Sequence, residues 1–346
     1  MTTTVIVTGA GGVGKTTLSA ALGVAFARSG STTLVMTIDP ARRLADALGL
    51  DALGDDPHRV ASEPNLFAAM LDVAASWEAI IHRYAEPDVV DRLLVNPYFR
   101  AIADRFPAAQ SYAAGERMAE HIESGRFDAI VVDTPPSAGG IDFFLAPART
   151  GHLLSGRLLR WLTGTRVPGR SVLYRFTARP MLRLADTVLG GPMLSEVADF
   201  LLDLGTMYDR LTVRSKTIER HLRNAETLIA TTADPTPIHE TRRFFDELAD
   251  IRIEPAAILF NQMLPASWVA AAKRNKPPIV EDAALGEVAA ANLKRWAGEA
   301  QRQADAATEL SARHGLPVHE VMWRVPPPAT LDDLAALVSD IPLPST

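Results

Sequence analysis

The sequence contains no cysteine, and this absence excludes several classes of site. Disulfide bonds, thiolate zinc sites and cysteine-held iron–sulfur clusters all need that side chain. No apolar run approaches the roughly 18–20 residues that a membrane-spanning helix requires. The first residues read directly as a strand, so we expect no signal peptide.

Acidic residues outnumber basic ones by 41 to 35, and the net charge of −6 does not favour nucleic-acid binding. With 346 residues, 47% of them hydrophobic, the chain can build one large α/β domain with an insertion, or two domains.

One segment has no acidic residue: Phe143–Ala185 carries arginines at 149, 157, 160, 166, 170, 175, 179 and 183. It forms either a solvated face or a surface for an acidic partner or anionic lipid headgroups.

A glycine-rich motif follows the first apolar run of the chain. Residues 9–16 read Gly-Ala-Gly-Gly-Val-Gly-Lys-Thr directly after Val5-Ile6-Val7, with the strand-then-helix spacing of a phosphate-binding loop. Glycines let backbone N–H groups surround an anion, and the helix start that follows also favours negative charge. Lys15 is placed to reach the β- and γ-phosphates of a nucleoside triphosphate, and Thr16 to hold Mg²⁺. A plain glycine-rich turn would not explain why every residue stands at the required offset. With the absences above, the motif indicates a cytoplasmic nucleotide-binding protein.

Apolar stretches rich in β-branched residues alternate with helical patterns, as in a mostly parallel sheet flanked by helices. The pattern predicts a helix over 15–29 and a capping box formed by Thr330 and Asp333 at the start of a final short helix. Strands are expected at about 4–8, 33–38, 66–71, 129–132, 227–231, 257–260 and 318–325. The prediction is therefore an α/β fold of the P-loop NTPase type.

Two long blocks without strands, about 73–125 and 145–222, read as helices broken by proline and glycine. We interpret them as a helical subdomain inserted into a single ATPase domain that spans 1–346. In 193–211, apolar residues repeat at three- and four-residue steps and make a wide stripe. Such a stripe is usually core, and the alternative is a groove for an apolar client.

Three of the predicted strands carry polar residues at their carboxyl ends, where ligands bind in parallel sheets. The first leads into the phosphate loop, the second into Asp39-Pro40, and the fourth into Asp133. A carboxylate after four apolar β-formers is the expected partner of the Mg²⁺ shell, so Thr16 and Asp133 are the candidate metal residues. The tail after Asp133 is rich in proline and glycine, which favours a loop that changes shape when the γ-phosphate leaves. Either carboxylate could instead belong to an ordinary turn.

Four motifs together resemble the ArsA-type ATPases, which include the arsenite-pump ATPase and the ATPase that targets tail-anchored membrane proteins. The resemblance covers most of the chain and looks closest to the actinobacterial "anion-transporting ATPase" branch. The motifs are the loop ending in Lys15-Thr16-Thr17, Asp39-Pro40-Ala41-Arg42-Arg43-Leu44, Asp133-Thr134-Pro135-Pro136 and Asn261-Gln262.

The resemblance implies ATP hydrolysis with Mg²⁺ by a dimer in which the nucleotides face each other across the interface. It makes Asp39 the carboxylate that orients the attacking water, and it makes Asp133 the start of a second switch loop near Mg²⁺; with Lys15 these are the expected catalytic residues. Asn261, which alone would read as a turn residue, matches the family's adenine-reading asparagine. The expected nucleotide site is Gly11, Gly12, Val13, Gly14, Lys15, Thr16, Thr17 and Asn261.

The chain departs from the family pattern in three ways. Ala10 stands where the family usually has a lysine that reaches the partner's phosphates, and such a charge can be worth about 10³–10⁵ in rate. A homodimer should therefore hydrolyse ATP slowly, unless Arg42 or Arg43 replaces the lysine or the partner is a lysine-bearing paralogue. The stretch near 270–276 lacks the zinc-binding cysteine pair of the eukaryotic targeting ATPases, so no zinc is expected. Because the chain has no thiols, we also expect no stimulation by arsenite.

These observations predict an ATP-driven switch whose helical blocks bind or release a client, and an apolar membrane-protein segment is the kind of client we expect. The alternative is a small-molecule phosphotransferase on the same fold, with an acceptor pocket built by the arginines of 149–183. A third reading, a membrane-surface positioning ATPase, needs a basic amphipathic tail that the ending Ile341-Pro342-Leu343-Pro344 cannot form. We expect no nucleic acid as a partner, whereas peripheral membrane contact remains open.

Overall fold

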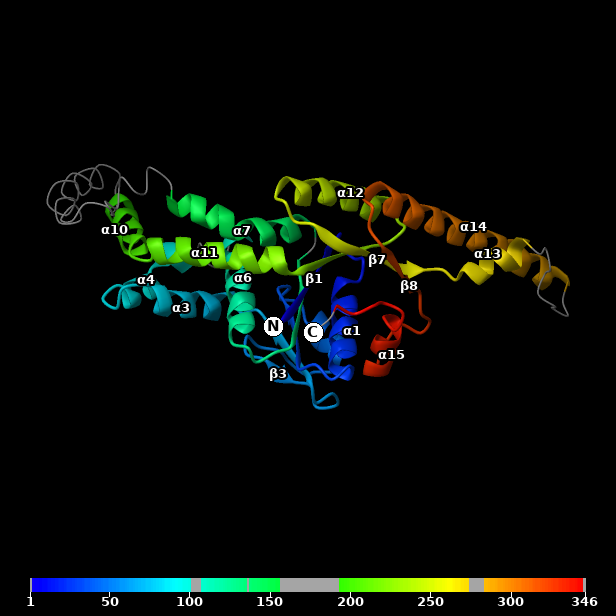
Figure 1. Cartoon of the computed structure of the whole chain (residues 1–346), viewed down its shortest axis with the longest axis horizontal. Coiled ribbons are helices and arrows are strands. Elements are labelled where there is room, and N and C mark those ends of the chain that lie inside the picture. The colour runs from blue at the N-terminus through cyan, green and yellow to red at the C-terminus, as the bar shows by residue number, and fades with distance from the viewer. Residues whose placement is uncertain (1, 101–106, 136, 156–192, 274–282, 345–346) are drawn as a thin grey trace. The chain divides into compact units, whose positions relative to one another are not determined.

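The computed structural model describes residues 2–100, 107–135, 137–155, 193–273 and 283–344 (Figure 1). The chain divides into two compact units. The first unit comprises Met1–Met70, Ser124–Ile141 and Ala225–Thr346, and the second comprises Leu71–Glu123 and Asp142–Asn224.

The first unit is built on an eight-stranded sheet with the order β3-β4-β2-β5-β1-β6-β7-β8. All paired neighbours run parallel except β3, which lies antiparallel to β4 at one edge. The strands are β1 (Thr3–Gly9), β2 (Thr33–Thr37), β3 (His58–Arg59), β4 (Leu66–Met70), β5 (Ala129–Asp133), β6 (Glu226–Thr231), β7 (Pro255–Met263) and β8 (Val318–Met322). The α/β architecture predicted from the sequence is confirmed.

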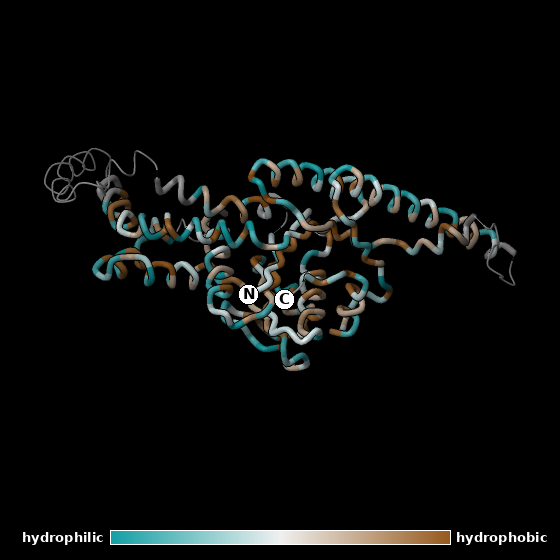
Figure 2. Tube along the Cα trace, viewed as in Figure 1, coloured by the Kyte–Doolittle hydropathy of each residue, from teal (hydrophilic) through white to brown (hydrophobic). Residues whose placement is uncertain are grey.

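Helices cover both faces of this sheet. Val5 and Val7 of β1 pack in one core with residues of α1, α2 and α15, whereas Thr8 faces Phe244 of α12 across Gly140. His314 of α14 stacks on Phe245 of α12 with ring centroids 3.8 Å apart, so α14 lies beside α12. In Figure 2, brown hydrophobic segments gather in the sheet and α1, and teal is more frequent along α12 and α14. The helices are α1 (Lys15–Arg28), α2 (Arg43–Leu48), α12 (Pro235–Asp250), α13 (Ala266–Lys273), α14 (Ala283–His314) and α15 (Leu331–Leu337).

The predicted capping box at the end of the chain is confirmed. The Thr330 hydroxyl accepts from the backbone N–H of Asp333, and the Asp333 carboxylate accepts from the backbone N–H of Thr330. This reciprocal pair satisfies two of the otherwise unpaired donors at the start of α15. It fixes α15 where the helix can pack against α1 (Figure 1).

The second unit is helical. Its helices are α3 (Val73–Tyr84), α4 (Val90–Val95), α6 (Pro107–Glu123), α10 (Met193–Gly205), α11 (Tyr208–Asn224) and most of α7 (Ser137–Ser155), within which the chain passes from one unit to the other. Trp77 stacks on Tyr112, with centroids 5.7 Å apart, and meets Phe99 edge-on. Below this aromatic group, the buried Glu116 carboxylate accepts from the guanidinium groups of Arg83 and Arg214 and from the Tyr84 hydroxyl.

Three local predictions differ from the structure. The two-residue edge strand β3 was not expected, because His58-Arg59 has no apolar alternation. The segment after Asp133 is helical from Ser137 onward, so only its first residues form a loop. The stripe over 193–211 is not one helix: α10 ends at Gly205 and α11 begins at Tyr208.

Gly140 has a packing role in this helix rather than a flexible loop. A Cβ on Gly140 would lie 2.7 Å from the Thr8 hydroxyl oxygen and 3.5 Å, an ordinary contact distance, from the Phe244 ring. The glycine therefore lets α7 approach β1 closely, and its presence does not require a mobile loop.

Candidate nucleotide-binding site

The phosphate loop lies between β1 and α1, as the sequence predicted. Gly14 caps α1 with φ 90° and ψ 23°, a left-handed conformation that glycine adopts without strain. A Cβ on Gly9 would lie 2.1 Å from the Ala230 carbonyl oxygen of the adjacent β6, so the loop also needs glycine at its start. Gly11 and Gly12 are exposed, and Thr16 and Thr17 are half-buried in the first turn of α1.

The Lys15 side chain folds back onto the backbone of the phosphate loop. Its ammonium group donates to the carbonyl oxygens of Gly9 at 3.1 Å and Ala10 at 2.8 Å. Burial lowers the pKa of Lys15, and the charges of Asp133 and Asp39 oppose that effect. A buried cation next to backbone donors makes this loop a suitable place for a polyphosphate.

Asp133 joins the loop to the neighbouring strand. One of its carboxylate oxygens, Oδ2, accepts from the Thr16 hydroxyl at 2.8 Å and from the Thr37 hydroxyl at 2.9 Å. Burial raises the pKa of Asp133 from 3.8 to about 6, although both hydroxyls and Lys15 act in the opposite direction. Asp133 therefore carries a charge that its surroundings only partly compensate at neutral pH.

The residues around Asp133 fit a magnesium ion. The second carboxylate oxygen, Oδ1, is buried and has no hydrogen-bond partner among the described residues. With the Thr16 hydroxyl it offers hard oxygen ligands, which Mg²⁺ takes together with phosphate oxygens and water. Such a bound cation would supply charge neutralisation at the phosphates. The described residues contain no group of three or more His, Asp or Glu side chains that could hold a metal without a nucleotide.

Asp39 follows β2 and is tied down by its own turn. Its Oδ1 accepts from the backbone N–H of Ala41 at 2.9 Å, and its backbone N–H donates to the Thr37 hydroxyl at 3.2 Å. Its Oδ2 pairs with the Arg43 guanidinium at 3.3 Å. Arg42 donates to the Asp51 carbonyl oxygen. Both candidate replacements for the missing lysine thus have partners on their own chain.

Asn261 lies against the phosphate loop at the end of β7. Its side-chain amide donates to the Val13 carbonyl oxygen at 2.8 Å, while its own carbonyl oxygen accepts from the backbone N–H of Gln262 at 2.9 Å. A Cβ on Gly14 would lie 2.4 Å from this amide nitrogen. The structure thus brings Lys15, Asp133 and Asn261 to the same loop.

Sequence reasoning missed Thr37 as part of this site. Thr37 is fully buried at the end of β2, where its hydroxyl donates to the Asp133 carboxylate and accepts from the backbone N–H of Asp39. Threonine is also an ordinary strand former, so its type gave no signal. The usable signal was its place two residues before Asp39, at the ligand-binding edge of the sheet.

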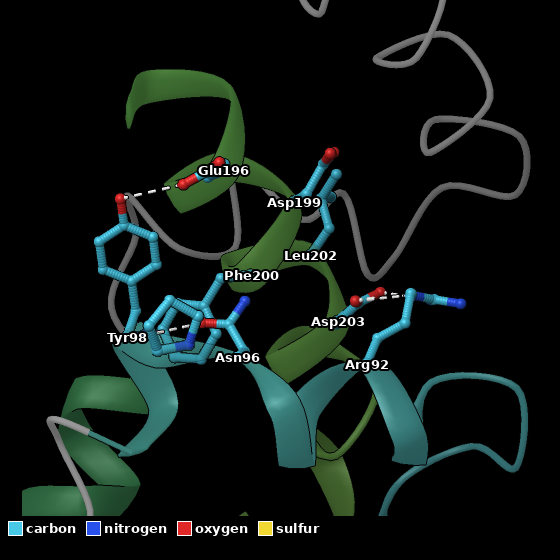
Figure 3. Close-up of a pocket in the computed structure, with 9 residues that line it drawn as sticks. Arg92, Asn96, Tyr98, Glu196, Asp199, Phe200, Leu202 and Asp203 are labelled. Atoms are coloured by element: carbon cyan, nitrogen blue, oxygen red, sulfur yellow. Dashed lines mark hydrogen bonds and ion pairs between the residues drawn. The ribbon is translucent and has the colours of Figure 1, made fainter. Parts of the chain in front are cut away.

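Among the described residues, cavities also lie away from the phosphate loop. One, of about 620 Å³ in the first unit, is lined in part by Gln262, Trp296 and Trp323. Another, of about 410 Å³ in the second unit, has a mixed lining in which Tyr98 bonds Glu196 and Arg92 pairs with Asp203 (Figure 3).

Several sequence predictions fall partly outside the described residues. Of the eight arginines in 143–185, only Arg149 is described, and it pairs with Asp142. Part of the stretch near 270–276 also lies outside. In the stripe over 193–211, the structure buries Phe200, Met207, Tyr208 and Leu211, whereas Val197, Leu201 and Leu204 are half-buried. No helix among the described residues is long and apolar enough to cross a bilayer.

Comparison with known proteins decides the family. The family model described as "Anion-transporting ATPase", the ArsA-type family, matches residues 2–277, which include the phosphate loop, Asp39, Asp133 and Asn261. The chain belongs to the anion-transporting ATPase family. Its activity is therefore ATP hydrolysis, and the resemblance noted in the sequence is confirmed.

Curated relatives of this ATPase include proteins of fungi and of Entamoeba. The chain is 27% identical to ATPase GET3 of Rhodotorula glutinis over 266 residues, which is 75% of this chain and 70% of that protein. It is 26% identical over 256 residues to ATPase GET3 of Mycosarcoma maydis, covering 74% and 71% of the two chains. It is 25% identical over 282 residues to an ATPase ASNA1 homolog of Entamoeba dispar, covering 76% and 77%.

Proposed function

We propose that this ATPase is a nucleotide-driven switch that works as a dimer and binds or releases a client at its helical unit. Mg²⁺ and ATP bind at the phosphate loop through Lys15, Thr16 and Asp133. The observation that carries the proposal is the pair of hydroxyl bonds to Asp133, from Thr16 and Thr37. Through them, one carboxylate contacts both the helix that follows the phosphate loop and the strand that leads to Asp39.

The order of events follows from these contacts. Lys15, which now holds two loop carbonyls, would bind phosphate oxygens, and the Thr16 hydroxyl and the unpartnered oxygen of Asp133 would hold Mg²⁺. The cation would supply charge neutralisation there, and Asp133 would keep its bond from Thr37 while giving up the one from Thr16. Because the chain enters α7 directly after the Asp133 loop and passes within that helix into the second unit, a shift at Asp133 has a covalent route to the helical residues.

The hydrolysis chemistry is in-line transfer of the γ-phosphoryl group to water. Asp39 orients the attacking water once it is released from Arg43. The freed guanidinium is then available for the charge that the missing lysine at Ala10 does not supply. Without such a cation, a homodimer hydrolyses slowly, and a lysine-bearing paralogue as partner would hydrolyse faster.

The client is an apolar segment of another protein, such as a membrane-protein helix. This part of the proposal is supported by family membership and by the size of the helical unit. A nucleotide can drive binding or release only by preferring one state, and a near-complete swing needs about 5.5 kcal/mol of preference.

Limited trypsin digestion tests the switch. The full chain is digested with Mg-ADP and with Mg²⁺ plus a non-hydrolysable ATP analogue, and Lys15→Ala serves as the nucleotide-blind control. We expect different rates or cut sites within 71–123 and 142–224 in the wild type, and identical patterns in the control. Identical wild-type patterns with both nucleotides bound would contradict the switch.

A further inference from the structure

We infer that Asn261 is a positioning residue for the phosphate loop: its side-chain amide holds the Val13 carbonyl and so sets the direction of the Gly14 N–H. The inference rests on the proposed nucleotide site and deepens it. It gives Asn261 a role that does not depend on the base of the nucleotide.

The first step of the argument is the hydrogen bond itself. The Asn261 amide nitrogen lies 2.8 Å from the Val13 carbonyl oxygen, across 248 residues of sequence. Val13 is fully buried and Asn261 is half-buried, so water competes poorly for this carbonyl. The bond therefore fixes the Val13–Gly14 peptide against β7.

The second step is the geometry of that peptide. A trans peptide is planar, and its C=O and N–H groups point in opposite directions. Because the Val13 carbonyl points toward Asn261, the Gly14 N–H points away from Asn261. Lys15 holds the Gly9 and Ala10 carbonyls at the other end of the loop. The two side chains together orient the loop from both ends.

The third step is that Asn261 is itself fixed. Its carbonyl oxygen accepts from the backbone N–H of Gln262, which has φ 60°. This bond determines which face of the amide is presented to Val13. Gly14 leaves room for the amide, because a Cβ there would come within 2.4 Å of the nitrogen. Gly14 is thus required both by its own φ and by the approach of Asn261.

The test compares ligands that share the phosphates and differ in the base. Dissociation constants of Mg-ATP, Mg-GTP and magnesium tripolyphosphate are measured by calorimetry for the wild type and Asn261→Ala. We expect Asn261→Ala to weaken all ligands by a similar factor of about 3–10, because one neutral hydrogen bond that fixes the loop is lost. Weakening of ATP alone, with the ATP-to-GTP ratio collapsing, would overturn the inference in favour of base reading. Unchanged binding of every ligand would overturn it as well.

A second measurement needs no ligand. Hydrogen exchange of a peptide covering residues 9–17 is followed in the nucleotide-free protein. Asn261→Ala should exchange several-fold faster there, while peptides from β1 and β5 stay as in the wild type. Unchanged exchange at 9–17 would overturn the inference even if no nucleotide bound. Absence of ATP binding by the wild type would instead overturn the proposed function.

Two variants serve as controls. Gln262→Asn keeps the backbone N–H that holds Asn261 and suits the positive φ, so it should leave binding and exchange unchanged. Asn261→Ser retains a short donor and guards against loss of folding in Asn261→Ala. It should give an intermediate effect on tripolyphosphate binding; an effect confined to ATP would again indicate base reading.

Discussion

Replacing Asp133 with asparagine should change how the stability of the ligand-free protein depends on pH. In the folded protein, burial raises the pKa of Asp133 from 3.8 to about 6. Between these values the folded state binds more protons than the unfolded state, so the free energy of unfolding falls as pH rises. The whole difference corresponds to about 3 kcal/mol, at 1.36 kcal/mol per pKa unit. Above about pH 7 the wild type carries nearly the whole of this cost.

The asparagine of Asp133→Asn does not titrate, so the stability of this variant lacks the pH-dependent cost. Its amide can still accept from Thr16 and Thr37, and any cost of placing an NH₂ group at the buried Oδ1 position is the same at every pH. About half of the wild-type loss falls between pH 5.0 and 7.5. Over that range the variant should gain about 1.5 kcal/mol in stability relative to the wild type.

The assay is urea unfolding in a chelator without nucleotide, followed by hydrogen exchange of β1 and β5 so that the unit containing Asp133 is reported. Thr37→Val provides a second variant. It removes a hydroxyl that lowers the pKa of Asp133, so the pH dependence should steepen. Parallel pH curves for the wild type and Asp133→Asn would refute the reasoning that burial leaves this carboxylate undercompensated.

Three further predictions follow from the contacts. Lys15→Ala should lower kcat for ATP hydrolysis by at least about 10²-fold, since a preorganised charge is lost; a smaller loss in steady-state phosphate release would argue against its role. Arg43→Ala should cost less than about 1 kcal/mol of stability, because its ion pair is exposed. If Arg43 also supplies the missing charge, the kcat of Arg43→Ala should fall about 10²-fold or more, whereas Arg42→Ala should keep near-normal turnover. In the helical unit, Glu116→Ala should cost about 3 kcal/mol in urea unfolding, because it removes one of the two carboxylates, Glu116 and Glu123, that lie 2.6 Å from the half-buried Arg214 guanidinium. Glu86→Ala, which breaks an exposed pair with Arg210, should cost under about 1 kcal/mol, and equal costs for the two variants would be inconsistent with this account.

The sequence predicted the sheet well because buried parallel strands appear as short apolar runs. Val5-Ile6-Val7 and Ala129-Ile130-Val131-Val132 are of this kind, and both lie at the centre of the sheet. Strand β3 was not predicted, because a two-residue edge strand buries no side chain and so leaves no apolar pattern. The start of α7 was misread as a loop because Gly139-Gly140 disfavours helix locally. The tertiary contact between Gly140 and Thr8 outweighs that propensity.

The site was predictable to the extent that its residues sit in a contiguous motif. The loop around Lys15 and the carboxylate of Asp133 could be identified from order and spacing alone. Thr37 and the bond from Asn261 to Val13 could not, because each depends on a partner that only the fold brings near. The pairing of Asp39 with Arg43 is local, at a spacing of four residues, and could have been anticipated from the start of α2.

Hydrogen exchange of the helical unit gives the most direct test of the claim that a triphosphate at the phosphate loop resets the helical residues. The wild type and Lys15→Ala are compared with Mg-ADP and with Mg²⁺ plus a non-hydrolysable ATP analogue, after calorimetry has shown that the wild type binds both. The account predicts that protection of α6 and α7 peptides differs between the two wild-type complexes. In Lys15→Ala, protection of these peptides should be the same with either nucleotide. Identical protection of these peptides in both wild-type complexes would contradict it.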